Sequence, residues 1–483
     1  MKALFLATVS TLLFADGAPE LIGLRTTLSA ETLRLPQQET LGLLGLSSTA
    51  DLGSFYLGPG FYGAARGGRG GFFTFGLEGG LRGRPTSLPL ELEAGLFVGG
   101  GGGGQAPQGG GLMLRPHVGA AITFGRVRLG AELSRVRFPN GDIDSTQAAL
   151  TLAFTSDRLW VPDTGWKTAF EGPVIWEHRD LEMEALRIEP SGTAHTRSGT
   201  PQQPLDLAGL TLTRDLRGSW FRFLTAEGAV RGSNAGYAQA LAGMGLRIPM
   251  VGPFGLEARL GAGLGGGGNV DVGGGFLLSG EGALALRMAN WGASTSLGFL
   301  KAPSGQLGGR AVSVRIAYRS SAPVPAEKGE AMVDFDLADW RVGTGVLIYR
   351  RAQRLLTRDG EIQLMTLRAD RKLSDQFYLS GEAGSATGGG SGGYSTGLAG
   401  LGCQTSIWAQ QRLFLETALG AGGGGSLRSG GGLLASLRGG WRLELPRGLG
   451  LEASVGRVRS LHGGLDTTTL GVGLHLRFKA IER

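Results

Sequence analysis

The chain has 483 residues with a formal net charge of +7, is 41% hydrophobic and contains 90 glycines. Glycine at about 19% far exceeds the usual ~7%, but there is no Gly-X-Y period of the collagen kind, and the hydrophobic content excludes a disordered chain. The basic residues are spread singly and form no patch or tail, which excludes nucleic acid as a partner.

The first residues have the pattern of a signal peptide. Lys2 gives a positive start, and Ala3 to Ala15 form an apolar run. Thirteen residues are too few to cross a bilayer as a helix but suit the core of a secretory signal. We therefore expect residues 1–18 to be a signal peptide, cleaved after Ala15 or Ala18. No later run reaches eighteen apolar residues, so the sequence predicts no membrane helices.

Further along the chain the dominant pattern is alternation with a period of two. In one segment Leu256, Ala258 and Leu260 alternate with Glu257 and Arg259. Such alternation indicates strands with one oily and one polar face. A soluble sandwich would show the same alternation. However, the segments run about 10–14 residues, longer than the 5–6 of soluble strands and close to the 9–11 that a membrane strand needs. The sequence therefore favours a transmembrane barrel with the oily face outward.

The chain also repeats itself about every 160 residues. Glu93, Glu257 and Glu416 each follow a leucine and precede two glycine runs, and they are 164 and 159 residues apart. Aromatic residues close each copy at similar spacings. Self-similarity at a fixed period indicates repeated structural units. After the signal peptide we expect three barrel repeats, at residues 19–157, 158–322 and 323–483.

Each repeat is expected to contain eight strands. In the third copy they are expected at Trp340–Leu355, Glu361–Leu373, Gln376–Ser385, Tyr394–Ile407, Arg412–Ala421, Leu433–Leu445, Leu449–Arg459 and Thr467–Phe478. An eight-strand unit could close alone, giving three separate barrels. The short joints between repeats favour a merged wall instead. The predicted fold is all-β: a single transmembrane antiparallel barrel of about 24 strands, with 16–18 strands as the fallback.

The chain ends on an alternating strand that includes Leu474, Leu476 and Phe478. This ending resembles the C-terminal signal of Gram-negative outer-membrane β-barrel proteins, which the barrel assembly machinery reads. The tail from Lys479 to Arg483 departs from the usual terminal aromatic. The resemblance implies location in the outer membrane of a Gram-negative bacterium, with membrane lipid and that machinery as partners.

The repeat alignment makes Glu93, Glu257 and Glu416 candidate lumen residues. Each has lipid-type neighbours on both sides, so each is expected to point inward, and in one 24-strand barrel they would lie about 120° apart. Such a ring could tune ion preference or seat a basic partner. The alternative is that each glutamate simply pairs with a nearby arginine on a wet wall.

No pattern in the sequence indicates an enzyme. The five histidines lack zinc-ligand spacing, so no metal, cofactor or catalytic residue is predicted. The glycine runs contain chance G-x-G-x-x-G matches without the flanking residues of a phosphate loop. We interpret them as places where the missing side chain permits sharp curvature or close approach of another backbone.

Two functions remain open from the sequence. The first is an outer-membrane channel, a porin or an export conduit for an anionic polymer or solute. The alternating strands and glycine-rich hairpins are similar to those of exopolysaccharide exporter barrels, without the helical repeats of those proteins. The second is a structural scaffold barrel whose lumen is filled by a partner protein, with a periplasmic or lumenal partner in either case.

Overall fold

The fold was analysed in a computed structural model, which describes residues 19–85, 89–162, 170–216, 218–332 and 335–483. The expected signal peptide lies outside the described residues. Strands account for nearly all of the regular structure, apart from two short 3-10 turns at Pro36–Gln38 and Pro446–Gly448. No helix among the described residues is long and apolar enough to span a membrane.

Twenty-four strands follow one another in the described part of the chain. The first eight are β1 (Glu20–Arg34), β2 (Thr40–Leu52), β3 (Phe55–Arg66), β4 (Phe73–Gly83), β5 (Leu90–Gly102), β6 (Met113–Phe124), β7 (Val127–Arg137) and β8 (Asp144–Pro162). The next eight are β9 (Val174–Pro190), β10 (Leu205–Asp215), β11 (Trp220–Arg231), β12 (Ala238–Pro249), β13 (Phe254–Gly266), β14 (Phe276–Met288), β15 (Trp291–Lys301) and β16 (Gly308–Pro325). The last eight are β17 (Asp336–Ala352), β18 (Gly360–Lys372), β19 (Phe377–Gly388), β20 (Ser395–Trp408), β21 (Gln411–Gly423), β22 (Leu433–Glu444), β23 (Leu449–Ser460) and β24 (Asp466–Glu482).

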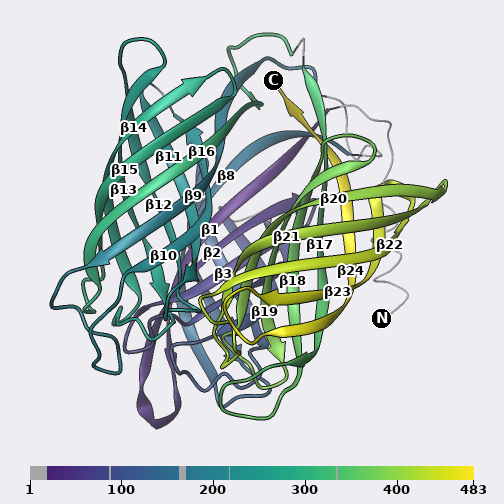
Figure 1. The fold of residues 1–483 in the computed structure, drawn as a ribbon. Helices are drawn as coiled ribbons and strands as arrows, with labels where there is room; N and C mark the ends of the chain where they lie inside the picture. The colour runs from purple at the N-terminus through teal and green to yellow at the C-terminus, as the bar shows by residue number, and fades with distance from the viewer. Residues whose placement is uncertain (1–18, 86–88, 163–169, 217, 333–334) are drawn as a thin grey trace.

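Each group of eight strands closes on itself, because its first strand pairs with its last. β1 pairs with β8, β9 with β16 and β17 with β24, all antiparallel. We call the three closed units barrel 1 (β1–β8), barrel 2 (β9–β16) and barrel 3 (β17–β24); they stand side by side in Figure 1. Three residues at the end of β24 also pair with β8, so barrels 1 and 3 share one hydrogen-bonded sheet of 16 strands.

The predicted single barrel of about 24 strands, built as one wall from three repeats, is therefore wrong. The strand positions expected in the third repeat lie within four residues of those observed. The error concerns closure: β8 returns to β1 over twelve residue pairs and does not continue the wall into β9. The predicted repeat boundaries at 157/158 and 322/323 fall inside β8 and β16, and the division itself stays a prediction.

At one end of the molecule, at the bottom of Figure 1, long loops join odd-numbered strands to the strands that follow them. We call this the loop end, and the opposite end the turn end. The loop after β3 contacts the loop after β13, the loop after β11 contacts the loop after β21, and the loop after β19 contacts the loop after β5. Each barrel thus offers one loop to each neighbour, which is the heterologous arrangement that closes a ring.

Glycine makes these loop contacts possible. A Cβ on Gly71 would lie 2.3 Å from the backbone nitrogen of Gly267, and one on Gly423 would lie 2.3 Å from that of Gly236. Between barrels 3 and 1, the Gly393 N–H donates to the Gly101 carbonyl at 2.9 Å. The glycine runs of each repeat are therefore contact surfaces between barrels, in line with the interpretation of close backbone approach.

The turn end joins the barrels a second time. The ends of β8 and β24 pair at Val161 and Lys479, and Ser321 at the end of β16 exchanges two backbone hydrogen bonds of 3.0 Å with Arg483. A small apolar cluster lies there as well: Leu159, Val161, Val174 and Ile481, with Leu21, Phe170, Trp176, Met332 and Phe335 packed against it. Contacts at both ends hold the barrels as one assembly.

The loop junctions predict a sharp difference between two glycines of barrel 3. Gly423→Ala should lower the free energy of unfolding by about 1–3 kcal/mol, because the new methyl group overlaps the backbone of barrel 2. The unfolding temperature should fall accordingly. Gly397→Ala is the matched control, since nothing lies within 4 Å of its added Cβ. The temperature at which the folded gel band converts to the unfolded one measures both variants. Equal effects would contradict the close contact.

Candidate functional site: the charged interior of the barrels

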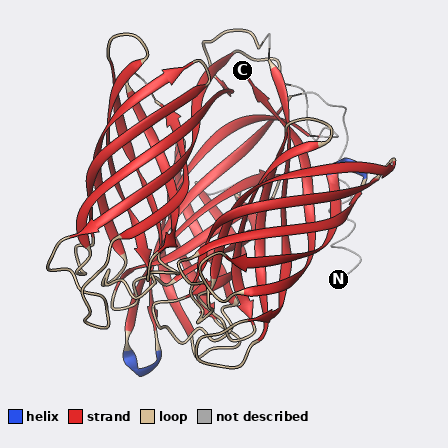
Figure 2. Ribbon diagram, in the orientation of Figure 1, coloured by secondary structure: helices blue, strands red, loops and turns tan. Residues whose placement is uncertain are grey.

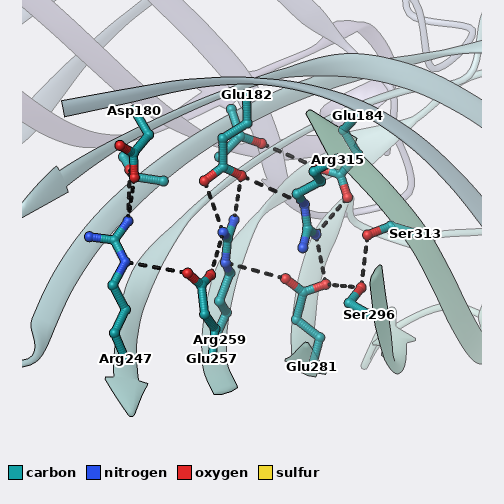
Figure 3. Close-up of polar contacts among 12 residues, drawn as sticks. Asp180, Glu182, Glu184, Arg247, Glu257, Arg259, Glu281, Ser296, Ser313 and Arg315 are labelled. Carbon is teal, nitrogen blue, oxygen red and sulfur yellow. Dashed lines mark hydrogen bonds and ion pairs between the residues drawn. The ribbon is translucent and has the colours of Figure 1, made fainter. Parts of the chain in front are cut away.

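The interior of barrel 2 is lined by acidic and basic side chains from alternating strand positions. β9 directs Asp180, Glu182 and Glu184 inward, and β13 directs Glu257 and Arg259 inward. All five are no more than 6% exposed. Figure 3 shows these side chains pointing toward one another across the barrel. The period of two therefore concentrates charge on the inner wall.

Each buried charge in this network has partners of opposite sign. Arg259 donates two hydrogen bonds of 2.9 Å to the carboxylate of Glu182 and a third of 2.9 Å to Glu257. Arg315 bridges Glu184 at 2.6 Å and Glu281 at 2.7 Å. A two-pronged guanidinium–carboxylate pair is both strong and geometrically specific. Such pairing is necessary, because an unpaired buried charge costs several kcal/mol.

Barrels 1 and 3 contain equivalent networks made from other residues. In barrel 1, Arg115 donates to Glu31 and to Glu132, both at 2.9 Å. In barrel 3, Arg438 donates to Glu416 at 2.8 Å and to Glu382 at 2.6 Å. Arginine–carboxylate pairs line all three barrels; the arginine comes from the sixth strand in barrels 1 and 3 and, for Arg259, from the fifth strand in barrel 2.

The three predicted lumen glutamates lie in three different barrels. Glu93 accepts a hydrogen bond of 3.0 Å from Arg82, Glu257 pairs with Arg259, and Glu416 pairs with Arg438. The structure therefore does not bring them together. A ring of these carboxylates on one wall is excluded, because no lumen contains more than one of them. Their observed contacts are those of the alternative in which each glutamate pairs with an arginine.

The ion pairs close each lumen at one level. Toward the loop end the inward residues become apolar and close it at a second level. In barrel 2 the cluster comprises Ile188, Leu205, Leu207, Phe221, Phe223, Ala229, Tyr237, Leu241, Val270, Val272, Leu277, Leu300, Ala302 and Leu307. Clusters of the same kind occupy barrels 1 and 3.

Outside the strands of barrel 1, Arg69 in the loop after β3 donates to Glu39 and lowers the pKa of that carboxyl.

Little space remains between these side chains. The cavity beside Glu182, Glu257 and Arg259 in barrel 2 has a volume of about 50 Å³. At the turn end of barrel 3 a larger cavity of about 270 Å³ lies between Arg341 and Glu444. The barrel 2 cavity has room for water molecules. Eight strands enclose a space that side chains can fill, and in barrel 2 they nearly do.

One group in the described residues has the composition of a metal site. Ligand atoms of Glu93, His117 and Glu132 lie within 4.8 Å of one another in barrel 1. Arg82 and Arg115 already donate to the two carboxylates, and Tyr56 lies 3.1 Å from His117 Nε2. The spacing rules for zinc ligands missed this group, because its members come from three different strands.

The arginine partners were not predicted residue by residue. A signal for one of them existed: Arg259 stands two positions after Glu257 and hence on the same face of β13. Partners on other strands, such as Glu182, depend on the barrel's closure and leave no local trace. The C-terminal residues Leu474, Leu476 and Phe478 lie on β24, with Leu474 exposed on the outer surface.

Comparison with known proteins adds no family. Neither a protein family nor a curated protein matches this sequence. Among solved structures, OccK11 (OpdR) of Pseudomonas aeruginosa is 13% identical, with 96% of this chain and 98% of that chain covered and a TM-score of 0.22. The outer membrane protein opdK of the same species is 11% identical, with 95% and 98% covered and a TM-score of 0.22. OccAB3 of Acinetobacter baumannii is 11% identical, with 96% and 100% covered and a TM-score of 0.20.

TM-scores this low mean that the chains do not superpose, so these likenesses carry no argument about fold or function. These matches do not show the expected likeness to exopolysaccharide exporter barrels. The fold and the site by themselves define an all-β protein of closed, charge-filled barrels.

The charged interior predicts a large effect for one arginine. Arg259→Met should destabilise the protein by about 3–5 kcal/mol, because it leaves Glu182 and Glu257 buried without their shared partner. Arg187→Met is the control: this arginine also pairs with a carboxylate, Asp206 at 2.9 Å, but its side chain is half exposed. Its loss should cost at most about 1 kcal/mol. Urea unfolding of the refolded proteins, followed by tryptophan fluorescence, measures both; similar midpoints would count against a structural role for the network.

Proposed function

We propose that this chain is an integral protein of the bacterial outer membrane, with its three barrels side by side in the bilayer. The supporting observation is the inverted surface. On β13 the outward residues Leu256 and Leu260 are 44% and 70% exposed, while Glu257 and Arg259 between them are buried. The same inversion occurs on β24. Soluble proteins rarely expose apolar surface over many strands, whereas lipid requires it.

Within that class, we propose a structural scaffold that is closed to solutes. Each barrel is shut at two levels, by its ion pairs and by the apolar cluster at the loop end. The chain's own side chains fill the lumens, so a lumenal partner protein is not needed to seal them. The loops and turns around the three barrels provide two broad faces, one on each side of the membrane, for attachment of other components.

The channel remains the second candidate, because the interior is polar over much of its length. The side chains inside barrel 2 leave a cavity of only about 50 Å³ beside Arg259, which argues against passage of a polymer. Conduction would require both levels of a barrel to open, with the arginines exchanging their carboxylate partners. A channel of this protein would therefore be narrow and gated.

Membrane residence is tested by fractionation. The protein should appear in the outer-membrane fraction and migrate faster on gels before boiling than after it, because a closed barrel resists detergent unfolding. Leu474, Leu476 and Phe478 are proposed to direct assembly by the barrel machinery. Recovery of the chain as a soluble periplasmic protein would overturn the proposal.

Scaffold and channel are separated by conductance. Purified protein in planar bilayers should give no defined conductance steps under moderate voltage, because both closures persist. A general porin measured in the same chamber serves as the positive control. Regular conductance steps would overturn the scaffold proposal in favour of the gated channel, provided that their number grows with added protein and their size changes in Arg259→Met.

A further inference from the structure

The outer face of barrel 2 has an unusual row of arginines near the turn end. Arg214 on β10 is the direct cross-strand neighbour of Arg179 on β9 and of Arg222 on β11. Their sequence neighbours Asp180 and Thr213 are buried inside the barrel, so the three guanidiniums lie on the outside. Like charges on directly opposed residues repel one another and are unfavourable in a sheet.

A fourth arginine and very little negative charge complete the group. Arg158 comes from β8 of barrel 1, and a single carboxylate, Glu177, is shared by Arg158 at 3.2 Å and Arg214 at 3.3 Å. Two further acidic groups act on the cluster: Asp157, next to Arg158 in the sequence, and Glu482 of barrel 3. Glu482 is already paired with Arg371 at 2.6 Å. The cluster therefore has an excess of positive charge at the junction of the barrels.

Part of this cluster is buried with an unused donor. Arg158 is only 9% exposed, and the Arg214 side chain is 21% exposed. The Nε of Arg179 is buried and has no hydrogen-bond partner in the described chain. Buried donors are nearly always satisfied by protein, water or ligand, so this group requires acceptor oxygens from elsewhere.

The cluster also breaks the likeness between the barrels. The equivalent row in barrel 1 can be located from the repeat spacing of 164 residues. Arg179 pairs with Ser320 on β16, and the residue 164 positions before Ser320 is Ser156 on β8. Ser156 pairs with Leu24, whose cross-strand neighbours continue the row in barrel 1. The row of barrel 1 is thus Leu24, Ala50 and Leu57. Barrel 1 has apolar residues where barrel 2 has three arginines, so the fold does not require these charges.

The surroundings indicate what the arginines meet. On the outer face, Leu181, Leu212 and Leu224 follow the row toward the loop end, and all are strongly exposed. On the opposite side of the row, toward the turn end, Trp220 is half exposed. Tryptophan collects at membrane interfaces, where phospholipid phosphates lie. The row therefore lies at the edge of the apolar band.

We propose that Arg158, Arg179, Arg214 and Arg222 bind the phosphate of an anionic phospholipid, with its acyl chains along Leu181, Leu212 and Leu224. This inference rests on the proposed membrane location. A guanidinium matches the two free oxygens of a phosphodiester, and basic pockets between membrane elements bind anionic headgroups. The adjoining leucines favour a lipid over free phosphate. The site lies at the turn end, and because outer-membrane barrels have their short turns on the periplasmic side, we place it in the periplasmic leaflet.

Native mass spectrometry of the refolded protein in neutral detergent tests the site. Phosphatidylglycerol should stay bound at activation energies that remove phosphatidylcholine. Arg214→Ala combined with Arg222→Leu copies the row of barrel 1 and should weaken retention of phosphatidylglycerol about thirty-fold, the effect of two interfacial arginines. Arg135→Ala combined with Arg457→Leu is the matched control, since these arginines are exposed and paired with Asp144 and Asp466.

Three results would overturn the proposal: equal retention of both lipids by the unaltered protein, equal loss in the control variant, or binding of inorganic phosphate as tight as that of the lipid. If the double variant does not fold, the lipid preference of the unaltered protein and the single Arg222→Leu variant decide. Heat-dependent gel migration of the same samples reports folding separately. A folded protein without lipid preference rejects this site alone, whereas recovery as a soluble protein rejects the membrane proposal.

Discussion

The pairing of inward-facing arginines with carboxylates is the interaction on which the rest of the structure depends. Eight strands form so narrow a barrel that side chains from opposite walls meet. Once the outer face is apolar, the inner face receives the polar residues, and charges confined there must find partners of opposite sign. Arg259 on β13 satisfies this condition by pairing with Glu257 on its own strand and with Glu182 on β9, across the barrel. The network thus seals the lumen and ties its walls together.

The glycine runs solve a different problem, the packing of one barrel against another. Apolar outer walls have no reason to prefer each other over lipid, so the specific contacts are made at the ends of the barrels. At the loop end, backbones approach as closely as Gly71 and Gly267 do, and only residues without side chains allow this. Because every barrel offers the same two loops, the contacts close into a ring.

Much of the fold could be predicted from the sequence, but its closure could not. Alternation locates the strands, since each strand must have an apolar and a polar face, and the glutamates were expected on the inner face for that reason. Closure depends on which strand β8 pairs with, and its two candidates, β1 and β9, have similar alternation. The short joints between repeats favoured β9. In the structure β8 and β16 end, and β9 and β17 begin, at the turn end, so each barrel is complete before the next one starts.

The ion pairs show the same division between local and distant information. Glu257 and Arg259 share a face of one strand, so their contact could be read from the sequence. The Glu182–Arg259 pair joins strands 77 residues apart, and only the closed barrel reveals it. The group of Glu93, His117 and Glu132 was missed for the same reason.

The choice of three small barrels over one large barrel has a physical consequence for function. A single 24-strand wall would enclose a wide, water-filled lumen that needs a separate plug, whereas each eight-strand wall is filled by its own residues. The polar faces that would have lined such a lumen are packed inside the three small barrels, and the apolar faces point outward and toward the seams between barrels. Specific recognition is therefore expected at those seams and not in the lumens. At the arginines between barrels 1 and 2 the outer surface departs from what lipid tails alone would require.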